Sequence, residues 1–313
     1  MRIPDVLSAI GHTPLVRLHA LDEGLPNAVY GKCEHLNPSG SIKDRIALAI
    51  VEAHEASGAL KPGGTLIEAT AGNTGMGLAM VAAVKGYRLI CVMPAKMSVD
   101  KRNALRMAGA EVVVTDNAPP NDPRNFQNVA RRLAEERGAV LADQFEHPAN
   151  IAAHERGTGP EILADLPDVG AFVAGAGTGG TLTGVGRALR AAGSHAQVWL
   201  ADPVGSLLAG TLEGRDDPDQ AYAVEGIGSS KVPGNLDLSL LAGAIRVSDD
   251  ESFATAHRLI REQGLFVGGS AGTNVAAALR VAALPSTQGP VVTVLCDSWD
   301  RYFSTPWLLS ADR

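Results

Sequence analysis

Lys43 is the side chain of this sequence with the most evident chemical potential, and it lies within Asn37-Pro-Ser-Gly-Ser-Ile-Lys-Asp-Arg45. A strand-like apolar run over residues 28–36 precedes this segment, and apolar residues recur at helical spacing from Ile42 to Val51. The pattern predicts Lys43 in the first turn of a helix, where the positive end of the helix dipole disfavours a cation. An amine that is also shielded from water would be favoured as the neutral form and could form an imine. Taken alone, however, the pattern favours a solvated surface lysine.

A second polar turn, Thr70-Ala-Gly-Asn-Thr-Gly75, joins a predicted strand to a predicted helix. It combines the polar side chains of Thr70, Asn73 and Thr74 with glycines that leave backbone N–H groups open to a ligand. Such a turn at a helix N-terminus suits a carboxylate. An ordinary strand-to-helix turn is a fair alternative for this loop by itself.

The third turn, Gly175-Ala-Gly-Thr-Gly-Gly-Thr181, consists of small or hydroxyl residues at the start of a predicted helix. Its amides and the hydroxyls of Thr178 and Thr181 predict a phosphate cradle. The turn also satisfies the dinucleotide pattern G-x-G-x-x-G, and Asp202 ends the next strand where a ribose-binding acid would lie. A NAD-binding protein that uses Gly175–Gly180 is therefore an alternative. The turn has no G-K-[ST] ending, which excludes an NTPase P-loop.

The fourth turn, Gly268-Gly-Ser-Ala-Gly-Thr273, again lies between a strand and a helix, and Ser270 offers a neutral hydroxyl. An N-cap serine would have the same spacing. Together the four turns supply a nucleophilic lysine, a carboxylate clamp, a phosphate cup and a neutral hydroxyl. These are the requirements of pyridoxal 5'-phosphate held as an imine.

The elements that position these turns alternate between strand-like runs and helices of ten to fifteen residues. This alternation predicts βαβ units and a parallel sheet, in which ligands bind at the carboxyl ends of the strands. A short strand is predicted over residues 265–267, and residues 205–241 are predicted to form a long irregular loop. Two αβ lobes with a boundary near residues 145–150 fit the chain length.

Composition and charge restrict the class of protein. The chain has 313 residues, 45% hydrophobic, and a formal net charge of −7 without a long basic run, which makes a nucleic-acid partner improbable. No apolar run reaches the length of a membrane span, and the N-terminus lacks the pattern of a signal peptide. The three cysteines match no zinc or disulfide pattern, and the histidines show no ligand spacing. We therefore expect a cytoplasmic protein without a metal or a membrane partner.

Five motifs in register resemble the cysteine synthase/cystathionine β-synthase family of fold type II pyridoxal-phosphate enzymes. They are Pro38-Ser-Gly-Ser-Ile-Lys-Asp-Arg45, Thr70-Ala-Gly-Asn-Thr-Gly75, Gly177-Thr-Gly-Gly-Thr181, Glu225-Gly-Ile-Gly228 and Gly269-Ser-Ala-Gly272. The resemblance covers nearly the whole chain. It implies an α/β fold like that of the tryptophan synthase β subunit, with two lobes of twisted, mostly parallel sheets flanked by helices. It also implies pyridoxal 5'-phosphate as the cofactor, held by the glycine cradle in place of a dinucleotide.

The resemblance implies a role for each motif residue. Lys43 is expected to hold the cofactor as an imine and to shuttle the α-proton. Asn73 should hydrogen-bond the ring hydroxyl, and Ser270 should face the pyridine nitrogen. The expected phosphate-binding residues are Gly177, Thr178, Gly179, Gly180 and Thr181. The expected substrate-binding residues are Thr70, Ala71, Gly72, Thr74, Gln144, Gly226 and Gly228.

The resemblance further implies a lobe organisation and an assembly. Residues 44–145 would form a smaller, mobile substrate-binding lobe that closes over the substrate. Residues 1–43 and 146–313 would form the larger lobe that binds pyridoxal phosphate. The family suggests a homodimer whose other partners are small-molecule amino-acid substrates.

The implied reaction is β-replacement on serine or an O-activated serine. A serine at the pyridine nitrogen, unlike a carboxylate, does not favour a protonated ring, which suits β-elimination to an aminoacrylate. A thiol then adds. The runs Asn117–Phe126 and Gly268–Gly272 are similar to the cystathionine β-synthase branch, and Ala71 stands where many cysteine synthases carry serine. We expect a short cystathionine β-synthase without haem or regulatory modules, with homocysteine as nucleophile. Cysteine synthase, with sulfide and O-acetylserine or O-phosphoserine, is the alternative.

Overall fold

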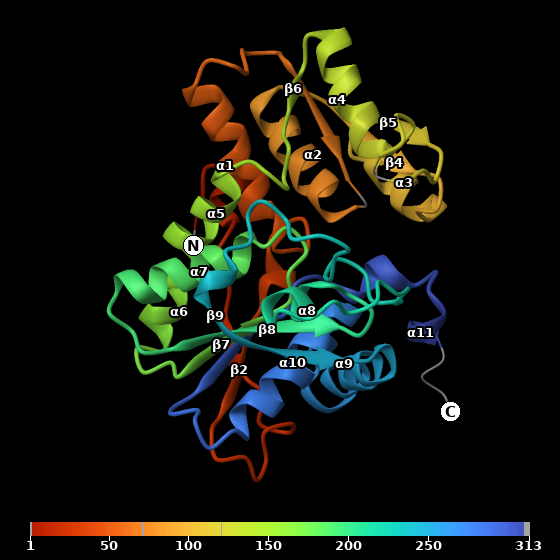
Figure 1. The fold of residues 1–313 in the computed structure, drawn as a ribbon. Coiled ribbons are helices and arrows are strands. Elements are labelled where there is room, and N and C mark those ends of the chain that lie inside the picture. The colour runs from red at the N-terminus through yellow and green to blue at the C-terminus, as the bar shows by residue number, and fades with distance from the viewer. Residues whose placement is uncertain (1, 71, 120, 310–313) are drawn as a thin grey trace. The chain divides into compact units, whose positions relative to one another are not determined.

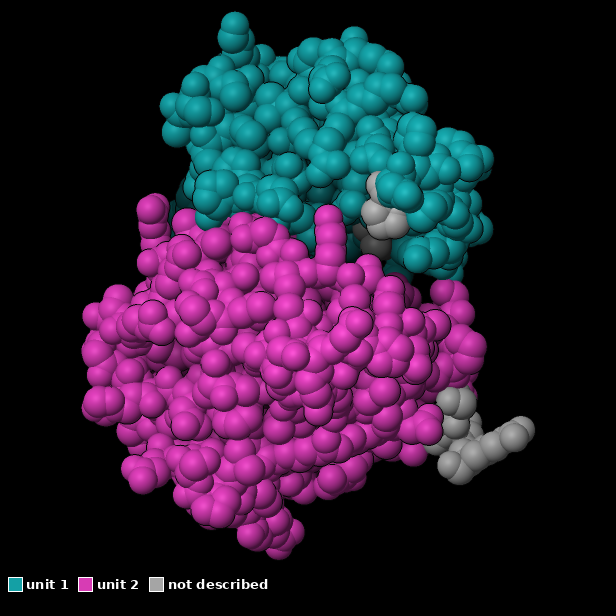
Figure 2. Space-filling model, viewed as in Figure 1, with its two compact units in different colours: residues 1–10, 37–149 teal, residues 11–36, 150–313 magenta. Residues whose placement is uncertain are grey.

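The computed structural model describes residues 2–70, 72–119 and 121–309, and these divide into two compact units. Unit 1 comprises residues 1–10 and 37–149, and unit 2 comprises residues 11–36 and 150–313 (Figure 2). Each unit has its own sheet, so the predicted two-lobed α/β organisation is confirmed. The chain crosses between the units three times, because residues 11–36 leave unit 1 to join the sheet of unit 2. That residues 44–145 bind the substrate stays a prediction. That residues 1–43 and 146–313 bind the cofactor also stays a prediction.

Unit 1 is built on a four-stranded, fully parallel sheet of order β5-β4-β3-β6 (Figure 1). In chain order its elements are η1 (Val6–Ala9), α1 (Lys43–Ala56), β3 (Thr65–Ala69), α2 (Asn73–Lys85), β4 (Arg88–Pro94), α3 (Val99–Met107), β5 (Glu111–Thr115), α4 (Phe126–Arg137) and β6 (Val140–Leu141). The central strand β4 is buried at every position after Arg88, as expected for a parallel strand with both faces covered. Ser98 and Asn125 accept backbone N–H bonds at the starts of α3 and α4 and so fix where these helices begin.

Unit 2 is built on a six-stranded sheet of order β1-β2-β10-β7-β8-β9, in which only β1 and β2 pair antiparallel. Its strands are β1 (Leu15–Arg17), β2 (Val29–Lys32), β7 (Ala171–Ala174), β8 (Gln197–Pro203), β9 (Leu241–Val247) and β10 (Val291–Val294). Its helices are η2 (Glu34–Leu36), α5 (Ala149–Ala153, whose first residue belongs to unit 1), the π-helix η3 (His154–Thr158), α6 (Gly159–Asp165), α7 (Gly180–Ala191), α8 (Leu208–Leu212), η4 (Leu238–Leu240), α9 (Asp249–Gln263), α10 (Gly269–Ala282), η5 (Trp299–Tyr302) and α11 (Pro306–Leu309).

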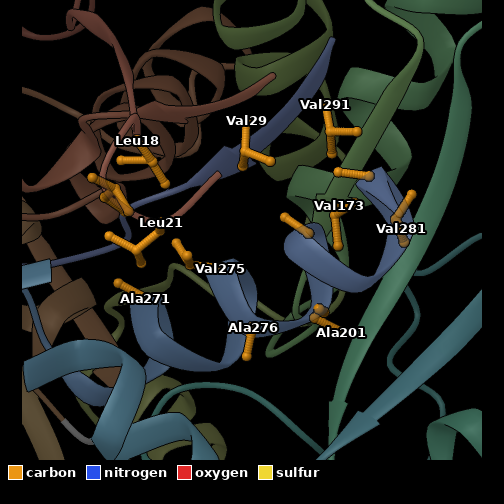
Figure 3. Close-up of a cluster of buried hydrophobic side chains, with 14 of the residues drawn as sticks. Leu18, Leu21, Val29, Val173, Ala201, Ala271, Val275, Ala276, Val281 and Val291 are labelled. Atoms are coloured by element: carbon orange, nitrogen blue, oxygen red, sulfur yellow. The ribbon is translucent and has the colours of Figure 1, made fainter. Parts of the chain in front are cut away.

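Helix α10 forms the centre of the unit 2 core. Small and β-branched residues occupy most of its length, and twelve of its fourteen residues are buried, because α9 packs on one side of it and the sheet on the other (Figure 1). Figure 3 shows Ala271, Val275 and Val281 among side chains from the β1–β2 region and from β7 and β10. A helix with small or apolar residues on nearly every side is stable only when it is enclosed in this way.

Several details of the secondary structure differ from the sequence-based expectation. The predicted irregular loop over residues 205–241 contains the short helices α8 and η4. Residues 265–267 form no strand, and only an isolated bridge joins Val267 to Ser298. Strand β9 was not predicted, because Ala242, Gly243 and Ala244 give its first half little preference for strand structure. The helical run from α5 through α6 was also missed. In the part of the chain that the structure describes, no helix is both long enough and apolar enough to cross a bilayer.

Candidate active site

Lys43 is the first residue of α1, as predicted, and its side chain is neither fully buried nor fully exposed. Its backbone N–H donates to Ser41 Oγ over 3.2 Å. The preceding turn is held by Asp44, whose fully buried carboxylate accepts from the backbone N–H of Ser39 over 2.6 Å and from the Ser39 hydroxyl. A carboxylate in the first helical turn is stabilised by the helix dipole. The aspartate beside the lysine thus fixes the turn that presents it.

The turn at Thr70 is stabilised by its own first residue. Thr70 is buried, and its hydroxyl oxygen accepts from the N–H groups of Gly72 over 3.1 Å and Gly75 over 3.3 Å. Gly72 has a φ of +151°, which a residue with a side chain rarely adopts. Asn73 is the first residue of α2 and is partly exposed, and Ala71 lies outside the described residues. The local backbone therefore turns sharply where a carboxylate is predicted to bind.

Thr74 and Gln144, both predicted to bind the substrate carboxylate, are directly bonded. The Thr74 hydroxyl donates to Gln144 Oε1 over 2.6 Å, and both side chains are buried. Gln144 Nε2 donates to Glu68 Oε1 over 3.2 Å and to the Ala69 carbonyl over 3.3 Å. The amide of Gln144 is therefore oriented with its oxygen toward Thr74 and its nitrogen toward the end of β3.

Glu68 is a member of this cluster that sequence reasoning missed. It is 2% exposed, and burial raises its pKa to about 8, although hydrogen bonds from Gln144 counteract part of the rise. A lone acid in the otherwise apolar strand β3 was the available sequence signal, because a buried carboxyl group requires hydrogen-bond partners. The carboxyl group fixes the amide that contacts Thr74.

The glycines of the predicted phosphate cradle are required by close packing within unit 2. A Cβ on Gly177 would lie 2.3 Å from the Gly226 carbonyl oxygen, and one on Gly179 would lie 2.5 Å from the Leu236 Cβ. Gly179 also has a φ of +85° and immediately precedes α7. A larger residue at either position would clash with these atoms and displace the turn, whose N–H groups lie at a helix N-terminus suited to an anion.

Two buried residues of the α5–η3 segment hold the hydroxyls of the cradle, and neither was predicted. Asn150 Nδ2 donates to Thr178 Oγ1 over 3.0 Å. His154 Nε2 lies 3.3 Å from Thr181 Oγ1, and its Nδ1 lies 2.9 Å from Thr158 Oγ1. No local pattern connects these residues to the cradle, because the contacts arise only when α5 and η3 pack on α7.

The predicted substrate-lining glycines lie against the cradle. Gly228 N donates to the Ala176 carbonyl over 2.9 Å, and both Gly226 and Gly228 have positive φ values. Ser270 is buried in the first turn of α10, at the same carboxyl edge of the sheet as the cradle. The structure thus brings together the unit 2 residues Gly177 to Thr181, Gly226 and Gly228, and it places Ser270 at the start of α10. Within unit 1 it brings together Thr70, Gly72, Thr74 and Gln144.

The donor set of the unit 2 cluster fits a phosphorylated pyridine. Helix α7 presents its N-terminal amides, Thr178 and Thr181 add hydroxyls, and Ser270 is a neutral residue. Asp202, the acid of the dinucleotide alternative, is fully buried, and its Oδ2 accepts from Ala209 N over 2.8 Å. Burial raises the pKa of Asp202. Among the described residues, no group of three or more His, Cys, Asp or Glu side chains is arranged to hold a metal ion.

Comparison with known proteins identifies relatives that are similar to this chain over nearly its whole length. The profile of the family described as "Pyridoxal-phosphate dependent enzyme" matches residues 6–297. Cystathionine beta-synthase of Rattus norvegicus is 42% identical over 316 residues, which cover 98% of this chain and 56% of the rat protein. Cysteine synthase of Staphylococcus aureus is 39% identical, with 97% and 96% coverage. This chain therefore spans little more than half of the rat protein.

A solved structure shows the same fold. The crystal structure of O-ureido-L-serine synthase superposes with a TM-score of 0.90 at 38% sequence identity. The superposition covers 100% of this chain and 97% of that chain. The similarity therefore extends over both units.

Proposed function

The chain belongs to the pyridoxal-phosphate dependent enzyme family, and on this premise we propose that it replaces the β-substituent of serine, or of an O-activated serine, with a thiol. The first candidate nucleophile is homocysteine, which makes the protein a cystathionine β-synthase. The Cβ–O bond of the donor breaks and a Cβ–S bond forms. The proposed enzyme is a cytoplasmic homodimer that acts on small-molecule amino acids.

The proposal assigns a role to each of the predicted site residues. Pyridoxal 5'-phosphate, when bound, supplies an aldehyde carbon for amines and an electron-withdrawing ring. Lys43 holds the cofactor and moves the α-proton of the substrate, and Asn73 donates to the ring hydroxyl. Residues Gly177 to Thr181 bind the phosphate, and Ser270 faces the pyridine nitrogen. A neutral partner there does not favour a protonated ring, which suits elimination of the β-substituent.

The proposal that the substrate is an amino acid rests on the Thr74–Gln144–Glu68 chain of hydrogen bonds. Its members are buried, polar and mutually oriented, next to the N-terminus of α2. These bonds orient the side chains around the start of α2, and the backbone N–H groups of that helix N-terminus suit one carboxylate. Thr70, Ala71, Gly72, Thr74 and Gln144 are proposed to bind the substrate carboxylate, and Gly226 and Gly228 to line the remainder. Residues 44–145 would then form the mobile, substrate-binding lobe.

The nucleophile separates two candidate functions. Similarity over 98% of this chain to a protein named cystathionine beta-synthase supports homocysteine. Similarity to a cysteine synthase over nearly the full length of both proteins supports sulfide, which is the second candidate. The name O-ureido-L-serine synthase of a similar structure points to an O-substituted serine as the product of that protein.

A competition assay tests the proposal. Purified protein loaded with pyridoxal phosphate is offered homocysteine and sulfide together, with serine, O-acetylserine or O-phosphoserine as donor, and products are separated by mass. Cystathionine as the main product is expected. Cysteine as the main product would favour the second candidate. If no thioether or thiol amino acid forms with any pair, and the protein binds only NAD, the proposed reaction is wrong.

A further inference from the structure

The side-chain amide of Asn274 lies between the carboxyl ends of two neighbouring strands of unit 2. Strands β7 and β10 pair from Ala171 and Val291 to Val173 and Thr293. One residue beyond β7, the N–H of Gly175 donates to Asn274 Oδ1 over 2.7 Å. At the last residue of β10, the Val294 carbonyl accepts from Asn274 Nδ2 over 2.8 Å. The side-chain amide therefore takes the place of the next backbone hydrogen bond between the two strands.

This insertion lies where the predicted cofactor contacts of unit 2 begin. Gly175 is the first residue of the glycine cradle, and Asn274 lies one helical turn after Ser270 on the same side of α10. Asn274 Nδ2 also lies 3.3 Å from the sulfur of Cys296, two residues beyond β10. One fully buried side chain thus connects the cradle, the helix of Ser270 and the end of β10.

The physical role of the amide follows from its two-sided pairing. A buried backbone donor or acceptor that loses its partner destabilises its surroundings, so both strand ends stay attached to Asn274. A primary amide has one acceptor and one donor side, which matches the N–H of Gly175 and the carbonyl of Val294. The amide holds the two strand ends at a separation that direct pairing would not allow.

We propose that Asn274 is a positioning residue that sets the distance between the phosphate cradle and Ser270, and so holds the phosphate and the ring of the cofactor in register. This inference rests on the proposed binding of pyridoxal phosphate by Gly177 to Thr181 and Ser270. Asn274 itself does not contact the reacting atoms. Its substitution therefore weakens the contribution of the phosphate to binding, with less effect on the attachment of the aldehyde to Lys43.

The test compares pyridoxal phosphate with pyridoxal, which lacks the phosphate. Dissociation constants of both are measured by absorbance for the wild-type protein, Asn274→Leu and Asn274→Ala. Asn274→Leu keeps the volume and leaves both strand ends unpaired, whereas Asn274→Ala leaves room for a water molecule. We expect the affinity for pyridoxal phosphate to fall about tenfold in Asn274→Leu and less in Asn274→Ala. The affinity for pyridoxal should change less than about threefold in either variant.

The neighbouring Thr273→Val variant is the matched control. Thr273 is equally buried on α10, and its hydroxyl donates to Ser252 Oγ over 2.7 Å, away from the cradle. In Thr273→Val, the ratio of the affinity for pyridoxal phosphate to the affinity for pyridoxal should equal the wild-type ratio. Equal losses for both ligands in Asn274→Leu, or no loss for either, would overturn the positioning role. Wild-type protein that binds neither ligand would instead show that the proposed cofactor site itself is wrong.

Discussion

A Cβ atom on Gly77 would lie 3.1 Å from the carbonyl oxygen of Lys43. Gly77 is in the second turn of α2, so the absence of a side chain there lets the starts of α1 and α2 approach closely. The same Cβ would lie 3.3 Å from the Cα of Asp44. The close approach of α1 to α2, and with it that of Lys43 to the helix that follows the Thr70–Thr74 turn, therefore depends on a glycine within unit 1.

Gly77→Ala tests this packing. Helix propensity alone would stabilise the variant by up to about 1 kcal/mol. Overpacking against two backbones destabilises by about 1–3 kcal/mol, so we expect a net loss of about 1 kcal/mol in the free energy of unfolding. Turnover should also fall, because Lys43 shifts away from the substrate turn. Urea denaturation and kcat measure the two effects, and a more stable variant with unchanged kcat would contradict the role of Gly77.

Lys43→Ala should abolish the near-visible absorbance of protein loaded with pyridoxal phosphate, together with turnover, because no other residue is proposed to hold the aldehyde. The fold should remain, since the side chain of Lys43 is only partly buried. Lys85→Ala is the control, because it removes another partly buried lysine of unit 1, paired with Glu55 over 2.8 Å. An unchanged spectrum in Lys43→Ala would refute the assignment.

Thr74→Val should raise the KM for the amino-acid donor about tenfold, because it removes the hydrogen bond that orients Gln144 beside the carboxylate clamp and leaves Gln144 Oε1 without that partner. The affinity for pyridoxal phosphate should be unchanged. Thr115→Val serves as control, since its hydroxyl donates to the Asp116 carbonyl over 3.3 Å at the end of β5. Steady-state kinetics distinguish the outcomes, and equal KM values for both variants would exclude Thr74 from the clamp.

Glu68→Gln should change how stability depends on pH. Burial raises the pKa of Glu68 from its usual 4.5 to about 8. Between these values the unfolded chain releases a proton that the folded protein keeps, so wild-type stability falls as pH rises. The loss has a slope of at most about 1.4 kcal/mol per pH unit.

The variant lacks this titration. Its stability relative to wild type should therefore increase steadily from pH 5 to pH 8, as measured by denaturant unfolding at several pH values. Parallel curves for the two proteins would show that Glu68 ionises normally. The amide that replaces the carboxyl group still offers an oxygen to Gln144 Nε2, so this contact should be kept, whereas the backbone N–H of Gln144, 3.4 Å from Glu68 Oε2, loses its acceptor at every pH.

Gly179 and Gly193 lie at the two ends of α7. A comparison of Gly179→Ala with Gly193→Ala distinguishes the effect of backbone strain from the effect of a steric clash. Both glycines have positive φ values, +85° and +70°, so both substitutions strain the backbone by about 1 kcal/mol. Only at Gly179 would the new methyl group meet other atoms within 4 Å. We expect both variants to lose stability, and only Gly179→Ala to lose affinity for pyridoxal phosphate, measured by absorbance titration. If the two variants bind pyridoxal phosphate with equal affinity, the phosphate does not bind at Gly179.

The parts of the site that could be predicted from the sequence are those whose geometry is local. A glycine-rich turn between a strand and a helix predicts open N–H groups at a helix N-terminus whatever surrounds it, as at Gly177 to Thr181. The position of Lys43 at the start of α1 followed from apolar spacing in the same way. Strand β9 was missed because a strand that begins with alanine and glycine depends on pairing with a neighbour, here β8, which no local pattern encodes.

The sequence by itself therefore determined the fold class, the family and the turns that carry the proposed cofactor contacts. Only the tertiary structure decided which side chains orient those turns. Thr74 and Gln144 are 70 residues apart in the chain, and Gly175 and Asn274 are 99 residues apart. Such pairs meet only after the parallel strands have aligned and the helices have packed on them. Their hydrogen bonds are consequences of register and packing, which no short stretch of sequence specifies.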